Sequence, residues 1–155
     1  MENFTKFIGI AFICTMHLLP TPINSQCNPP PAEECEPAMA LCGLPLLNGY
    51  CCTNIEYYNP TGCMPLCPNG GTTSNTGWWA FATNGGQVSI SINFNNCTVN
   101  GLGLQMGIMG DCHCGESLAC NSTCGGPSTY AISANLTACK LYYLFINGCS
   151  GDVCN

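Results

Sequence analysis

Gln87–Phe94 reads QVSISINF, a stretch in which apolar and polar side chains alternate at every position. Successive side chains of a β-strand point to opposite faces, so this alternation predicts a strand with one buried and one solvated face. The predicted buried face comprises Val88, Ile90, Ile92 and Phe94. The apolar face of such a strand is expected to pack against a second layer of the same domain.

The period of two recurs later in the chain, in Leu102–Met109 and in Tyr130–Thr137. Trp78–Thr83 (WWAFAT) and Leu141–Asn147 (LYYLFIN) are apolar on both faces, which is typical of central strands. No 11-residue window has a convincing helical period. Five or more strands of this kind predict an all-β fold, a single antiparallel β-sandwich similar to a jelly roll.

Asn84-Gly85-Gly86 separates the first apolar run from Gln87–Phe94. Asn and Gly readily adopt the positive φ that two-residue hairpin turns require. The sequence therefore predicts that these two strands form a hairpin.

The composition excludes several classes of protein. The 155 residues contain 2 Lys+Arg against 8 Asp+Glu, a formal charge of -6, with 46% hydrophobic residues. Proteins that bind nucleic acid neutralise phosphates with Lys and Arg, so we expect no nucleic-acid partner. Disordered chains combine low hydrophobicity with high charge, which this chain does not.

Residues 1–25 are predicted to be a secretory signal peptide, with Lys6 before the apolar run Phe7–Leu19 and prolines after it. The run is shorter than the roughly 20 apolar residues of a membrane helix. Residues 26–45 are predicted to form an irregular Pro/Glu/Cys-rich arm, and residues 46–155 the sandwich. We therefore expect a secreted or surface-exposed protein that is soluble after cleavage.

Cleavage would remove Cys14 and leave 15 of the 16 cysteines. Cysteines in an oxidising compartment mostly form disulfides, and an odd number predicts one free thiol or one intermolecular bond. The neighbours Cys51 and Cys52 are expected to have different partners. Local bridges are an option for Cys63/Cys67, Cys120/Cys124 and Cys149/Cys154. The expected disulfide cysteines are Cys27, Cys35, Cys42, Cys51, Cys52, Cys63, Cys67, Cys97, Cys112, Cys114, Cys120, Cys124, Cys139, Cys149 and Cys154.

Few residues suggest a metal site or catalysis. Asp111-Cys112-His113-Cys114, with Cys120 and Cys124 nearby, has zinc-like spacing, but disulfides are the expected state of these thiols. Calcium at Asp111, Glu116 or Asp152 would need six or more oxygen ligands, and the acidic group Glu33, Glu34 and Glu36 is expected to be solvated. Glu56, Asp111, Glu116 and Asp152 are the carboxylates from which a glycosidase pair could be drawn. The expectation is no enzyme, no metal and no cofactor.

Aromatic rings offer a carbohydrate-binding alternative, because their faces stack on sugars while Asn side chains bind hydroxyls. At paired positions one ring should face inward and leave the other exposed. The candidate rings are Tyr57, Tyr58, Trp78, Trp79 and Tyr142. Asn96, Asn121 and Asn135 begin N-glycosylation sequons, which matter only in a eukaryotic secretory pathway.

The order WWAFATNGGQVSISINF, GLGLQMGIMGDCHCGESLAC and YAISANLTACKLYYLFINGCSGDVC resembles Cys-rich β-sandwich modules of large secreted and surface proteins of Bacteroidetes. In outline it is similar to the jelly roll of bacterial pre-peptidase C-terminal domains. The resemblance covers about Leu46 to Cys154 and implies a non-catalytic extracellular module with a structural, adhesive or assembly role.

In the modules that this chain resembles, one more strand usually follows the segment that ends here at Asn155. We therefore expect an open sheet edge, unless the N-terminal arm covers it or the reading frame is truncated. The expected partners are surface or matrix proteins, a second copy bound through this edge or the odd cysteine, or glycans. A secreted inhibitor-like scaffold is a further alternative.

Overall fold

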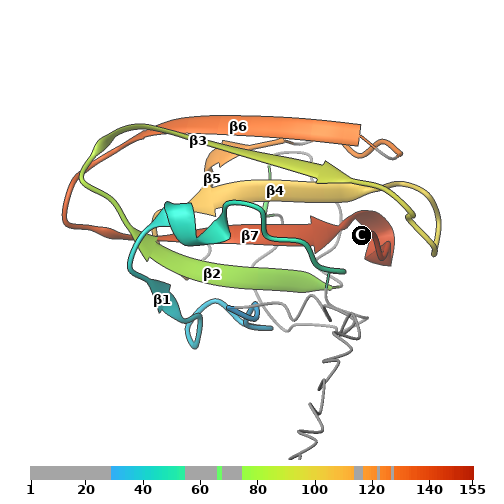
Figure 1. Cartoon of the computed structure of the whole chain (residues 1–155), viewed down its shortest axis with the longest axis horizontal. Coiled ribbons are helices and arrows are strands. Elements are labelled where there is room, and N and C mark those ends of the chain that lie inside the picture. Colours follow the sequence, from blue (N-terminus) through green and yellow to red (C-terminus); the bar gives the residue numbers. More distant parts are fainter. Residues whose placement is uncertain (1–28, 55–65, 68–74, 114–116, 122, 127) are drawn as a thin grey trace, which may run out of the picture.

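The computed structural model describes residues 29–54, 66–67, 75–113, 117–121, 123–126 and 128–155; the expected signal peptide lies outside them. Strands dominate the described part (Figure 1). None of its helices has the length and apolar character needed to cross a membrane. The elements are β1 (Ala40–Leu41), the 3-10 turn η1 (Leu44–Leu47), β2 (Thr76–Ala82), β3 (Gly86–Phe94), β4 (Leu104–Met109), β5 (Ser117–Cys120), β6 (Ser128–Leu136), β7 (Leu141–Gly148) and the 3-10 turn η2 (Cys149–Gly151).

The strands form two sheets, which confirms the predicted all-β, disulfide-rich sandwich. One sheet has the order β1-β2-β7-β4-β5 and the other pairs β3 with β6. All of these pairs are antiparallel except β1 with β2. From β2 to β7 every connection except β4–β5 crosses from one sheet to the other, the winding that characterises a jelly roll.

The core between the sheets follows the predicted alternation. The inward side chains of the larger sheet include Trp79, Phe81, Met106 and Leu144, all buried. Those of β3 and β6 pack against them and include Ile90, Ile92 and Ile132. The opposite faces of β3 and β6 carry exposed Ser89, Ser91 and Ser133, so these two strands are half-buried as predicted.

The larger sheet is buried on its other face as well. There Trp78, Met109 and Phe145 pack with Leu66 and with Ala32 and Ala38 from the N-terminal segment. This cover explains why all six residues of β4 are buried, although their alternation predicts one solvated face. Residues 29–41, expected to be an irregular arm, form the β1 pairing and place Leu41 in the core.

The predicted hairpin at Asn84-Gly85-Gly86 is wrong, because β2 and β3 lie in different sheets. β2 needs two covered faces and β3 only one, so the two strands do not suit neighbouring positions in one sheet. Gly85 and Gly86 have φ of 87° and 89° and carry the chain across between the layers. A Cβ at Gly85 would lie 2.9 Å from the backbone nitrogen of Ala138, so the crossing also requires the small residue.

The disulfides join segments that are far apart in the sequence. The pairs are Cys35–Cys112, Cys67–Cys120, Cys97–Cys154 and Cys124–Cys149, with separations of 77, 53, 57 and 25 residues. Cys52 is also disulfide-bonded. The local alternatives Cys63/Cys67, Cys120/Cys124 and Cys149/Cys154 are therefore wrong. The fold brings segments that are distant in the sequence side by side, and the spacing of the cysteines along the chain does not record this.

These disulfides indicate an oxidising environment. Exposed Cys42 and Cys139 carry no disulfide. Cys27, Cys63 and Cys114 lie outside the described residues, so the expected odd cysteine stays a prediction.

Candidate functional site

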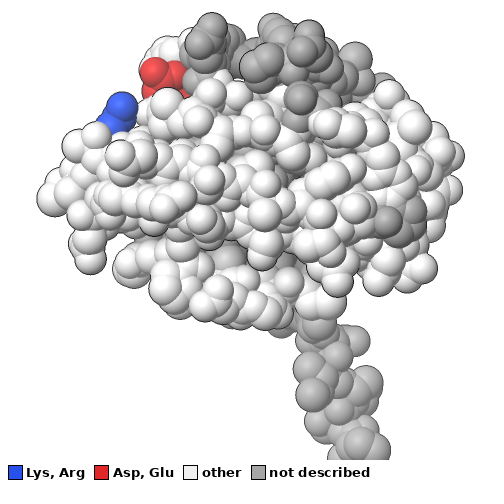
Figure 2. All heavy atoms as spheres, turned by 90° about the horizontal axis from the view of Figure 1, so that it is seen from above, with Lys and Arg blue, Asp and Glu red and all other residues white. Residues whose placement is uncertain are grey.

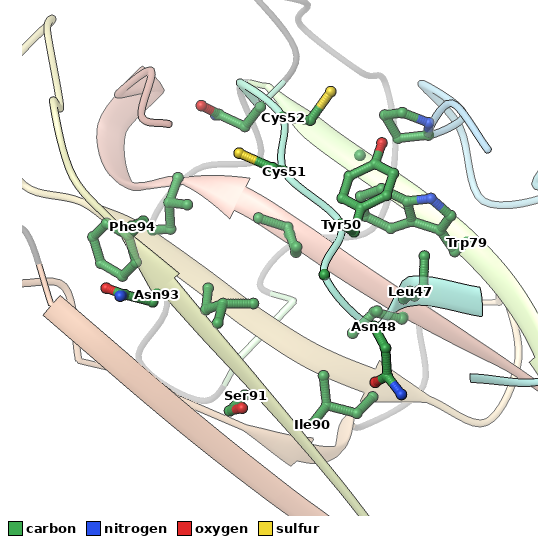
Figure 3. Close-up of a pocket in the computed structure, with 18 of the residues that line it drawn as sticks. Leu47, Asn48, Tyr50, Cys51, Cys52, Trp79, Ile90, Ser91, Asn93 and Phe94 are labelled. Carbon is green, nitrogen blue, oxygen red and sulfur yellow. The ribbon is translucent and has the colours of Figure 1, made fainter. Parts of the chain in front are cut away.

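A pocket of about 630 Å³ opens between β3 and the segment that contains η1 and continues to Asn54. Figure 3 shows Leu47, Tyr50 and Cys52 of this segment on one side and Ser91 and Phe94 of β3 on the other, with β7 passing between them. The pocket has a simple structural cause. Strands lie about 4.8 Å apart, so the outer strands of the larger sheet are roughly 19 Å apart and β3 and β6 only about 5 Å. The smaller sheet does not cover the whole inner face.

The floor of the pocket is apolar. Trp79, Leu144 and Ile146 come from the larger sheet, and Ile90 and Ile92 come from β3. The described residues that line it include no Asp, Glu, Lys, Arg or His side chain. An occupant therefore gains free energy by burying uncharged apolar groups, whereas a buried charge would find no counter-charge.

Tyr50 adds a polar group to this wall. Its ring meets the Trp79 ring edge-on, with centroids 5.6 Å apart. The Tyr50 hydroxyl is buried and has no hydrogen-bond partner among the described residues. Burial raises the pKa of Tyr50 above its ordinary value, so the hydroxyl is protonated at neutral pH and can donate.

The outer edge of β3 borders the pocket along six consecutive residues, Ser89–Phe94. Consecutive residues include both faces of a strand, so the pocket runs along the strand's edge. Just beyond β3, Asn95 and Asn155 exchange two main-chain hydrogen bonds, of 2.7 and 3.0 Å. Asn155 also lines the pocket. Among the described residues no strand other than β6 pairs with β3.

A buried carboxylate holds the segment that ends in Asn155. Asp152 is fully buried and accepts four backbone N–H hydrogen bonds, of 2.8 to 3.2 Å, from Val99, Asn100, Gly103 and Val153. Its backbone oxygen accepts two more hydrogen bonds, from the side-chain amides of Asn54 and Asn75. This network ties the segment after β7 to the loop between β3 and β4.

Burial alone would raise the pKa of Asp152. The four backbone hydrogen bonds lower it by more than burial raises it, so the pKa of Asp152 lies below its ordinary value. Asp152 is therefore a structural anion. Its carboxylate oxygens are occupied by N–H donors, and the nearby Cys97 and Cys154 are bonded to each other. These three groups do not form a metal site.

Of the aromatic residues proposed to bind sugars, Trp79 forms part of the pocket floor, whereas Trp78 and Tyr142 do not line the pocket. Trp78 and Trp79 are 8% and 5% exposed, on opposite faces of the larger sheet, so neither ring of the pair is left on the surface. Tyr142 is 3% exposed, and its hydroxyl donates to the Thr137 carbonyl and accepts from the Thr137 N–H. Tyr57 and Tyr58 lie outside the described residues.

The zinc-like cluster is not assembled in the described part of the chain. Cys112, Cys120 and Cys124 are in disulfides with three different segments, and His113 and Asp111 are exposed. The Asp111 carboxylate accepts the His113 backbone N–H, which closes a local turn. Cys114, Glu56 and Glu116 lie outside the described residues, and Glu33, Glu34 and Glu36 are exposed.

The three sequons have different surroundings. Asn96 and Asn135 are exposed, and Asn96 has a φ of 46°. The Asn121 side chain accepts the Met106 N–H at 2.5 Å and donates to the Leu104 carbonyl at 3.5 Å, so a glycan there would disrupt the edge of β4. N-glycosylation itself stays a prediction.

The sequence reasoning missed the pocket. Tyr50 and Leu47 carry no motif, and their place beside Trp79 depends on how the segment before β2 folds back over the sheet. One signal was present in β3. It contains neither Lys nor Pro, which are the residues that usually protect an edge strand.

Comparison with known proteins gives no relative for this chain: no protein-family model matches it, and neither a curated protein nor a solved structure does.

Proposed function

We propose that this protein is a secreted, non-catalytic β-sandwich module that holds a macromolecular partner outside the cell, in a structural, adhesive or assembly role. The observation that carries the proposal is the pocket along the outer edge of β3, with which no described strand other than β6 pairs. An apolar floor and walls without charged side chains suit retention of a partner rather than acid–base chemistry, which needs titratable groups at the site. Resemblance to Cys-rich surface modules agrees with this role.

The disulfides support the extracellular part of the proposal. Each of the four pairs closes a loop of at least 25 residues and limits the unfolded ensemble. A module that works outside the cell benefits from such cross-links because no chaperone refolds it there. Among the described residues, the surface seen from the side of β3 and β6 bears almost no Lys, Arg, Asp or Glu side chains (Figure 2).

Site-specific photo-crosslinking in the cells that make the protein tests this function. A photoreactive amino acid in place of exposed Asn48 lies at the pocket, and one in place of exposed Ser133 lies on the solvated face of β6. We expect Asn48 to give a discrete crosslinked species of higher mass and Ser133 to give none. Uncrosslinked monomer at both positions, or the same crosslinks from both, would contradict a partner held at the pocket.

A further inference from the structure

We propose that the pocket is a strand-addition site: an extended segment of another polypeptide, uncharged and with apolar side chains at alternate positions, pairs with the outer edge of β3. The inference rests on the proposed attachment function and names the class of partner. It follows from the main-chain groups of β3, the shape of the pocket and the absence of charged side chains along the described lining.

The hydrogen bonds between Asn95 and Asn155 show where such pairing begins. In an antiparallel pair, two opposite residues that exchange both bonds direct their main-chain groups toward each other. These groups alternate sides along a strand, so Asn93 and Ser91 face the same outer edge as Asn95. An incoming strand would continue the pairing that Asn155 starts, antiparallel to β3.

The side chains of the incoming strand would also find suitable surroundings. The pocket follows Ser89–Phe94, and six residues of a strand span about 20 Å. Alternate apolar side chains would meet Ile90, Trp79 and Leu144 at the floor. The intervening side chains would join the solvated row that contains Ser91 and Asn93. The Tyr50 hydroxyl is the one buried side-chain polar group of the lining that lacks a hydrogen-bond partner among the described residues.

The geometry favours a single extended segment over a folded second copy. The Leu47–Asn54 segment lies opposite β3 across the pocket (Figure 3). A sheet edge of another folded molecule would bring its neighbouring strand into that wall. The far edge of β6 is a weaker site, because β6 lies beside β5.

A synthetic peptide with the sequence of Gly86–Phe94 has the required alternation and no charged residue. The control peptide contains the same nine residues, with its apolar residues placed consecutively. Binding to the full, disulfide-bonded chain is measured by fluorescence anisotropy, and amide hydrogen exchange locates the contact. We expect the alternating peptide to bind at least tenfold more tightly and to slow exchange at Ser89, Ser91 and Asn93.

Proline substitutions provide a matched pair of variants. Ser91 and Ala131 are register partners whose N–H groups, by the alternation above, face the two opposite outer edges of the small sheet. Ser91→Pro removes a donor at the pocket, and Ala131→Pro removes the equivalent donor at the far edge. We expect at least a tenfold loss of peptide binding in S91P only. Tyr50→Phe, which leaves the backbone intact, is expected to weaken binding several-fold.

Equal binding of the two peptides, protection of β6 in place of β3, or equal losses in S91P and A131P would overturn the proposal. If neither proline variant folds, the proposal is tested by amide exchange of the unchanged protein with the peptide and by peptide binding to Y50F. Self-association that S91P abolishes, without peptide binding, would identify a second copy as the occupant and reject the free segment. Position-specific crosslinks from Asn48 without peptide binding would reject strand addition but leave the attachment function standing.

Discussion

The two sheets of this sandwich differ in the length and regularity of their edge strands. The larger sheet ends in β1, with two residues, and in β5, with four residues and irregular pairing next to Met109. The smaller sheet consists of two nine-residue strands without a charged residue or a proline. Short or irregular edge strands resist pairing with other chains, whereas long, uncharged edges invite it.

The disulfide cysteines lie outside β3 and β6, although Cys97 follows β3 by three residues and Cys124 precedes β6 by four. In the larger sheet, Cys120 belongs to β5 and Cys149 directly follows β7. Both faces of the larger sheet are buried, but β3 and β6 keep one face in solvent. The larger sheet therefore supplies most of the stability and the smaller sheet supplies the surface that can accept a partner.

Removal of a cross-link from the larger sheet should have the largest effect. The Cys35–Cys112 bond closes a loop of 77 residues, and its loss in the double Cys→Ala variant should lower the free energy of unfolding by about 4.5 kcal/mol. Guanidinium denaturation measures this change. Cys42→Ser, at an exposed cysteine without a disulfide, is the control and should change it by less than about 0.5 kcal/mol. Equal effects would show that the cross-link does not stabilise the sheet.

Truncation of one side chain in each sheet compares their packing directly. Phe145 is fully buried against Trp78, and Phe145→Ala should cost about 4 kcal/mol. Ile90 of β3 is only half-buried beside the pocket, so Ile90→Ala should cost about 2 kcal/mol. Urea denaturation of both variants gives the comparison. A larger loss for Ile90→Ala would reverse the assignment of stability to the larger sheet.

Loss of the Asp152 carboxylate should release the segment beside β3. Asp152→Asn places an amide group against N–H donors, and we expect a loss of about 3 kcal/mol at pH 7. Because folding lowers the pKa of Asp152, its contribution is present above the unfolded pKa of about 3.9 and is lost as the pH falls through the folded pKa. Thermal unfolding from pH 7 to 2 should therefore show less acid destabilisation in D152N. Parallel pH profiles for both proteins would refute this role.

A charge on the edge of β3 should have the smallest effect on stability. Ser91 is exposed, so Ser91→Lys should change the free energy of unfolding by less than about 0.5 kcal/mol. Lysine on an edge strand nevertheless opposes pairing, and we expect at least tenfold weaker binding of the alternating peptide. Ala131→Lys, on the partner strand, is the control and should bind normally. Fluorescence anisotropy with both variants tests whether the two edges differ.

Local patterns predicted the strands well. The alternation in Gln87–Phe94 and the fully apolar runs around Trp79 and Leu144 indicate how many faces each of these strands buries, because successive side chains of a strand point to opposite faces. They therefore also indicated a two-layer sandwich. The hairpin at Asn84-Gly85-Gly86 was wrong because a turn signal does not say whether the next strand returns to the same sheet.

Composition and local pattern are enough to indicate a small, disulfide-rich, all-β domain, because alternation, cysteine content and low charge are local or compositional properties. The folded chain is needed to see which cysteines pair, which face the N-terminal segment covers, and where the pocket lies. Each of these depends on contacts between residues tens of positions apart. The outer edge of β3 depends on both sequence and tertiary structure. Eight residues of the sequence show the alternation of β3. That β3 pairs with one strand only follows from how the seven described strands divide between two sheets.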